Sequence, residues 1–161
     1  MSELSAKSAY PWKTVLWAGL LVGTLDISAA TTHFLISGGS DPSKIFVYIA
    51  SGVFGQAAFE TGGTMAWWGL FFHYLIAYIW TAFFFLIYPR FGFMSGNWIL
   101  IGVLYGIFVW LMMNRVVLQL ANTPKNPFRL TNAIINCLIL IGMIGLPLSF
   151  IARKRQQAQS T

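Results

Sequence analysis

Ionisable side chains inside long apolar stretches are the residues of this sequence best suited to chemistry. Asp26 and His33 lie seven residues apart in the first such stretch, and His73 lies in the second. Seven residues make two helical turns, so Asp26 and His33 share one face of a helix. Ionisable groups are costly inside a membrane and mark packed or functional positions there. Since histidine titrates near neutral pH, proton or cation handling is one chemistry that this pattern favours.

The depths of Asp26 and His73 in their helices predict that the two side chains meet. Asp26 lies eleven residues before Ser37, and His73 lies nine residues after Thr64. At about 1.5 Å per residue, two antiparallel helices would bring them to nearly the same level. We therefore expect an Asp26–His73 pair near the middle of the membrane, with either a functional role or only a structural one.

Further polar residues gather toward the same end of the apolar stretches. Together with the pair they form a candidate polar chamber of Asp26, His33, Glu60, His73, Asn114, Arg115, Asn132 and Asn136. Other roles are open for several of them. Asn132 and Asn136 could join helices by hydrogen bonds, Arg115 could extend to the lipid headgroups, and Glu60 could be solvated at the interface.

The elements that position these residues are long apolar helices. The chain has 161 residues, 57% of them hydrophobic and 9% charged, whereas a soluble domain has about 25% charged residues. Four stretches reach the roughly 20 residues that cross a bilayer, at 14–37, 64–88, 97–120 and 131–152. We expect one all-α domain with four transmembrane helices in a bundle and short tails at 1–13 and 153–161.

The segment 43–60 is only marginally long enough to cross a membrane. Asp41 and Pro42 before it are typical of a helix start. We expect an interfacial or partly re-entrant helix, and a fifth span is the alternative.

Charge counting favours four spans with both termini in the cytoplasm. Six basic residues would lie on the cytoplasmic side against three on the other. The six are Lys7, Lys13, Arg90, Arg153, Lys154 and Arg155, and the three are Lys44, Lys125 and Arg129. The predicted location is the cell inner (plasma) membrane. The first stretch resembles a signal peptide in part, but its apolar sequence continues to Ile36.

Small residues at helical spacing predict where helices pack closely. Glycines with this role are Gly19, Gly23, Gly69, Gly102 and Gly106. Arg115 lies on the opposite face of its helix from Gly102 and Gly106, so only one of these faces can be tightly packed.

Several classes of function are disfavoured. The basic residues form no stripe with interleaved aromatic residues, so we expect no nucleic-acid binding. Cys137 is the only cysteine, which excludes an internal disulfide. His33 and His73 differ in depth by about five residues, so we expect neither haem nor a metal ion.

Several short patterns resemble a known group of proteins. They are Gly19-x-x-x-Gly23, Asp41-Pro42, Ile49-Ala50-Ser51-Gly52 with Gly55, and Gly69-x-x-x-His73 leading to Tyr88-Pro89-Arg90. Together they are similar to small bacterial inner-membrane proteins distantly related to the YagU-like group. The resemblance spans Leu16 to Pro127 and implies a four-helix architecture in a bacterial inner membrane. It implies no catalytic residues.

Three functions are compatible with the sequence. The first is a non-catalytic accessory or scaffold subunit whose partners are lipid and other membrane helices, as a homo-oligomer or a hetero-complex. The second is a small oligomeric transporter or channel for protons, cations or small solutes, using the polar chamber. The third is an intramembrane enzyme acting on a lipid or a quinone. No enzymatic motif is visible, so the sequence favours a protein that is not an enzyme.

Overall fold

The computed structural model describes residues 12–90, 97–124 and 129–159, and helices make up most of these ranges. The predicted N-terminal tail lies outside them up to residue 11, as does Lys125. The helices are α1 (Trp12–Ile36), α2 (Ser43–Phe54), α3 (Ala57–Thr61), α4 (Gly63–Ile87), α5 (Trp98–Met112), α6 (Leu118–Leu120), α7 (Leu130–Leu140) and α8 (Leu146–Gln159). Two π-helical segments, η2 (Met113–Val117) and η3 (Ile141–Gly145), join α5 to α6 and α7 to α8.

Four helices in the described ranges are long and apolar enough to cross a membrane, which confirms the prediction of four such helices. They are Trp12–Ile36, Gly63–Arg90, Trp98–Leu120 and Leu130–Ala158. The last helix continues well past its predicted end at residue 152. Its extension is rich in Ala, Arg, Lys and Gln, which favour helix and also suit a watery environment.

The segment 43–60 folds as two helices rather than one. Gly55 ends α2 with a φ of +61°, and its amide donates to the Ser51 carbonyl over 2.8 Å. Glycine reaches this φ without a steric penalty, which permits the break. Asp41 lies at the start of α2 as expected, because its Oδ1 accepts the Ser43 amide over 2.9 Å. With twelve residues, α2 is too short to cross a bilayer alone.

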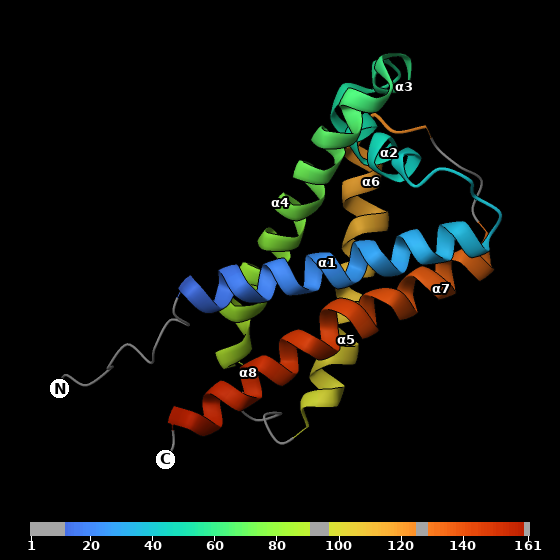
Figure 1. Cartoon of the computed structure of the whole chain (residues 1–161). Coiled ribbons are helices and arrows are strands. Elements are labelled where there is room, and N and C mark those ends of the chain that lie inside the picture. The colour runs from blue at the N-terminus through green and yellow to red at the C-terminus, as the bar shows by residue number, and fades with distance from the viewer. Residues whose placement is uncertain (1–11, 91–96, 125–128, 160–161) are drawn as a thin grey trace.

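α1 crosses α4 and α5 at a wide angle (Figure 1). α1 packs on α4 and on the continuous helix formed by α7, η3 and α8, while α5 packs against that same helix. α2 packs along the beginning of α4. The first turn of α1 and the last turn of α8 lie at one end of the molecule, here called the terminal end (Figure 1).

Glycines lie where these helices come closest. A Cβ at Gly69 would strike the carbonyl oxygen of Phe46 in α2, and one at Gly106 would lie 2.5 Å from the Ile141 Cα. A Cβ at Gly102 would lie 2.7 Å from the Ser149 Oγ. The face of α5 with these glycines is therefore the tightly packed one, and Arg115 is exposed.

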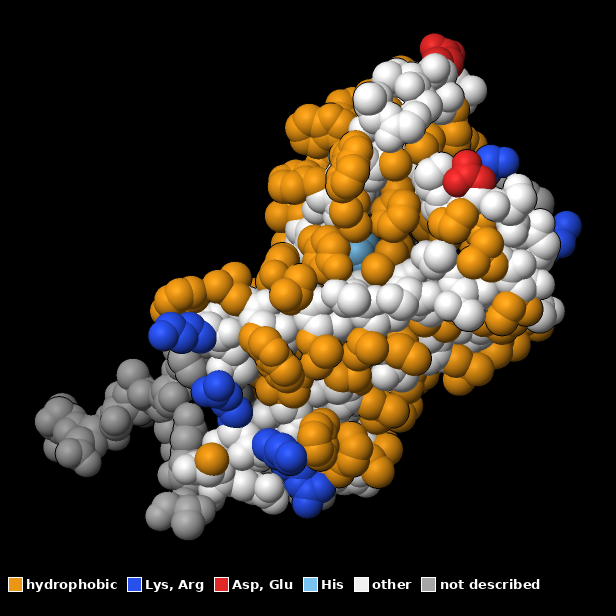
Figure 2. Space-filling view, in the orientation of Figure 1, with side chains coloured by type: hydrophobic (Ala, Val, Ile, Leu, Met, Phe, Trp, Pro, Cys, Tyr) orange, Lys and Arg blue, Asp and Glu red, His pale blue; other side chains and the backbone are white. Residues whose placement is uncertain are grey.

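Most buried apolar side chains form one cluster among α1, α4, α5 and the C-terminal helix, centred on residues such as Val22, Phe84, Tyr105, Val109 and Leu148. Hydrophobic side chains also cover much of the outer surface (Figure 2). A surface of this kind fits a hydrocarbon environment, since a soluble protein rarely exposes such large apolar patches.

Candidate functional site

The crossing of α1 and α4 is built around His73. The His73 side chain is only 9% exposed, and its Nε2 lies 2.8 Å from the carbonyl oxygen of Gly23. A carbonyl oxygen only accepts hydrogen bonds, so Nε2 carries the proton and donates it. In the neutral imidazole, Nδ1 then keeps a lone pair that can accept a proton.

Asp26 lies in the same interface, three residues after Gly23. Its side chain is half-buried, and His73 is near enough to act on it electrostatically. Within the described residues, however, no salt bridge joins Asp26 to a basic side chain. The structure therefore brings the two residues of the expected pair together as neighbours across the helix crossing, without a direct ion pair.

Thr24 and Tyr74 extend this polar group, and sequence reasoning missed both. The Thr24 Oγ1 lies 2.9 Å from the Tyr74 Oη, and the Tyr74 ring lies edge-on to His73 with centroids 5.4 Å apart. Tyr74 and Tyr78 are four residues apart in α4 and pack against Gly23 and Gly19 in α1. The matching four-residue spacings of glycine and tyrosine were the signal that could have revealed this contact.

The other candidate chamber residues are dispersed. Two of them contact residues four positions away in the sequence: the His33 Nε2 lies 3.5 Å from the Ser37 Oγ, and the Asn114 Nδ2 donates to the Trp110 carbonyl over 2.8 Å. The exposed ones are Glu60, Arg115, Asn132 and Asn136. Among the described residues, no hydrogen bond or salt bridge links any of these six to Asp26 or His73.

Asn132 and Asn136 are exposed carboxamide side chains inside a helix of membrane-spanning length. They are four residues apart in α7, so they share one face of the helix. Neither carboxamide forms a hydrogen bond with any other part of the chain that the structure describes. Each carboxamide therefore faces outward with no hydrogen-bond partner among the described residues, where a membrane would surround the helix.

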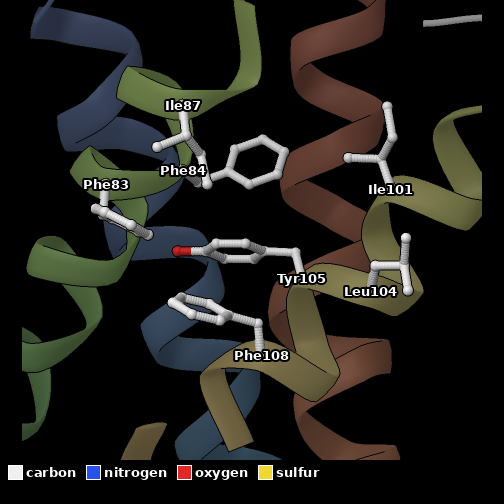
Figure 3. A pocket seen from close by; sticks show the side chains of 7 residues that line it. All are labelled: Phe83, Phe84, Ile87, Ile101, Leu104, Tyr105 and Phe108. Atoms are coloured by element: carbon white, nitrogen blue, oxygen red, sulfur yellow. The ribbon is translucent and has the colours of Figure 1, made fainter. Parts of the chain in front are cut away.

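An apolar pocket of about 320 Å³ lies between α4 and α5. Its walls are Phe83, Phe84, Ile87, Ile101, Leu104, Tyr105 and Phe108 (Figure 3). The Tyr105 Oη donates to the Trp80 carbonyl over 2.5 Å. None of the residues predicted for the polar chamber lines this pocket, and no pattern in the sequence indicated it.

Comparison with known proteins finds no match. No model of a protein family, no curated protein and no solved structure matches the chain. Among the described residues, no three His, Cys, Asp or Glu side chains lie together in a way that could hold a metal ion.

Proposed function

We propose that this protein is a non-catalytic accessory or scaffold subunit of the cell inner membrane, with cytoplasmic termini, that acts by binding other membrane helices. The proposal includes α7 as the binding element. Its partner is a second copy of the chain or another membrane protein that offers polar groups at the matching depth.

The exposed Asn132 and Asn136 side chains carry this proposal. An amide without a hydrogen-bond partner costs several kcal/mol when it moves from water into hydrocarbon. Hydrogen bonds between helices reduce that cost, and each contributes roughly 0.6–2 kcal/mol to association within a membrane. A partner helix against α7 would therefore be favoured, and the four-residue spacing offers it two such bonds on one face.

The native mass of the protein tests the proposal. The full chain is purified from its own membranes in a mild detergent, and the mass of the assembly is measured by native mass spectrometry. We expect the wild type to occur in an assembly heavier than the single chain. The double variant Asn132→Leu/Asn136→Leu should shift the assembly toward the single chain.

Ser28→Leu/Thr32→Leu is the matched control. Ser28 and Thr32 are also exposed and four residues apart in a long apolar helix, but Thr32 already donates to the Ser28 carbonyl over 2.8 Å. The control should keep the wild-type mass. A wild-type protein that is monomeric at every detergent concentration would contradict the proposal.

Proton or cation handling is a second candidate function, and the proximity of Asp26 to the buried His73 supports it. Both lie near the middle of their helices, and Nδ1 of His73 can accept a proton. Reconstituted liposomes with an internal pH dye would reveal proton flux. Asp26→Asn should then abolish that flux, and an unchanged flux in this variant would reject the second function.

A further inference from the structure

The pocket between α4 and α5 lies toward the terminal end of the molecule. α4 runs toward this end and α5 begins there, so the pocket residues 83–87 and 101–108 belong to the half nearer to it (Figure 1). Leu104 in the pocket wall is 50% exposed, so the pocket opens on the outer surface of the helices. In a bilayer, the hydrocarbon tails of lipids surround that opening.

The pocket walls suit a hydrocarbon chain better than a polar ring. Six of the seven lining residues are purely apolar, and the seventh is Tyr105. The Tyr105 hydroxyl already donates to Trp80, and its ring lies against Phe84 with centroids 4.7 Å apart. The walls therefore offer no free hydrogen-bond donor to the carbonyl oxygens of a quinone, whereas an acyl chain needs none.

Basic side chains lie just beyond the pocket at the terminal end. Arg90 follows the pocket residue Ile87 by three residues and lies in the turn just after the end of α4. The Arg90 Nη1 donates to the Leu86 carbonyl over 3.0 Å, which holds the guanidinium close to the last turn of α4. Arg153 lies near enough to Tyr88 to act on it electrostatically. Lys and Arg side chains gather at this end of the surface (Figure 2).

We infer that the α4–α5 pocket binds one acyl chain of an anionic phospholipid, whose phosphate group lies against Arg90. An apolar pocket beside a cationic group matches the two parts of such a lipid, its tail and its headgroup. Basic groups at the ends of membrane helices recognise anionic headgroups in this way. This inference goes beyond the proposed function, since lipid binding at the terminal end requires no contact through α7.

Native mass spectrometry of the full chain with added lipid tests the inference. The two probes are phosphatidylglycerol and phosphatidylcholine with identical acyl chains. We expect the wild type to bind phosphatidylglycerol more tightly. Arg90→Gln should weaken phosphatidylglycerol binding about fivefold, the ratio expected from about 1 kcal/mol per basic group, and leave phosphatidylcholine binding unchanged.

Filling the pocket should weaken the binding of both lipids. Leu104→Trp places a large side chain in the opening, and Leu104→Phe does so with less added bulk. Ile99→Trp and Lys44→Gln are the matched controls, since Ile99 is an exposed α5 residue outside the pocket and Lys44 is an exposed basic residue at the other end. Both controls should bind as the wild type does.

Three results would overturn the inference. They are equal affinity of the wild type for the two lipids, an unchanged lipid preference in Arg90→Gln, and unchanged binding in whichever Leu104 variants keep the wild-type helix content.

Discussion

At the scale of single residues, Gly23 and His73 together determine how α1 and α4 cross. A Cβ at Gly23 would lie 3.0 Å from the Tyr74 ring and 3.1 Å from the Ala77 Cβ, so the glycine lets α4 approach closely. The approach in turn brings His73 to the carbonyl of Gly23. The glycine thus permits the contact, and the histidine adds a directional bond that favours one register.

Removing the His73 donor should therefore loosen this crossing. We expect His73→Leu to lower the free energy of unfolding by about 1 kcal/mol, the usual net contribution of a hydrogen bond. Unfolding by SDS, followed by circular dichroism, would measure the change. His33→Leu is the control, because the His33 Nε2 lies 3.5 Å from the Ser37 Oγ just after the end of α1 and, among the described residues, forms no hydrogen bond to another long helix. Equal stability of the two variants would show that the His73 bond contributes nothing specific.

Part of the site was predictable at this scale. The neighbouring positions of Asp26 and His73 followed from counting residues along two antiparallel helices, because helix rise is constant. The outward direction of Asn132 and Asn136 was not predictable, because apolar residues surround both in sequence and periodicity marks no buried face there. The Thr24–Tyr74 contact depends on the rotation of each helix, which depth alone does not specify.

At the scale of helices, α5 packs closely against the C-terminal helix. Gly102 and Gly106 of α5 face η3 and α8, and a Cβ at Gly145 would strike the carbonyl oxygen of Gly102. Where Gly102 meets Gly145, neither residue has a Cβ, so the two backbones can approach closely. Small residues have the same role in many membrane helix pairs, where packing rather than the hydrophobic effect drives association.

Gly106→Ala should destabilise this pair. Its new Cβ would lie 2.5 Å from a backbone atom, the Ile141 Cα, so the helices would have to separate. We expect a loss of about 1–3 kcal/mol, as for other overpacked sites, measured by the same SDS titration. Gly142→Ala, whose new Cβ would have no neighbour within 4 Å, should be neutral or slightly stabilising. A loss of similar size in both variants would contradict the packing role.

Acidification should weaken the start of α2. Hydrogen bonds from the Ser43 side chain and amide hold the pKa of Asp41 below its ordinary value of 3.8. The ionised carboxylate is thus favoured in the folded state, so its stabilising contribution is complete above about pH 4 and declines as the pH falls through the lowered pKa. Hydrogen exchange of the α2 amides should therefore be faster in Asp41→Asn than in the wild type at pH 6. At pH 2 this difference should vanish, and a difference that persists would rule out the titration of Asp41 as its cause.

The four long helices were predictable from hydropathy, and seven of their eight ends lie within two residues of the expected positions. The break between α2 and α3 was not, because it depends on the positive φ of Gly55, a conformation that glycine permits but does not require. The π-helical segments η2 and η3 were also missed. They reflect local hydrogen-bond shifts that leave no mark on the hydropathy pattern.

At the scale of the whole molecule, two exposed features lie on different helices. The α7 face carries Asn132 and Asn136, and the α4–α5 pocket opens beside the basic terminal end. Neither could be read from the sequence, since both depend on the angles at which the long helices cross. A membrane partner on α7 and an anionic lipid at the pocket are compatible with each other, because the two sites use different helices.

The central claim is that the α7 face with Asn132 and Asn136 binds another membrane helix. A photo-crosslinker attached to Cys137 in intact membranes tests this claim most directly. Cys137 is the only cysteine and adjoins Asn136, so a maleimide–benzophenone reagent reports on whatever lies beside α7. We predict a crosslink from wild-type α7 to a second copy or to one defined membrane protein. This product should be lost in Asn132→Leu/Asn136→Leu and kept in Ser28→Leu/Thr32→Leu. Crosslinks to lipid alone, or the same protein product in all three, would contradict binding through the Asn132–Asn136 face.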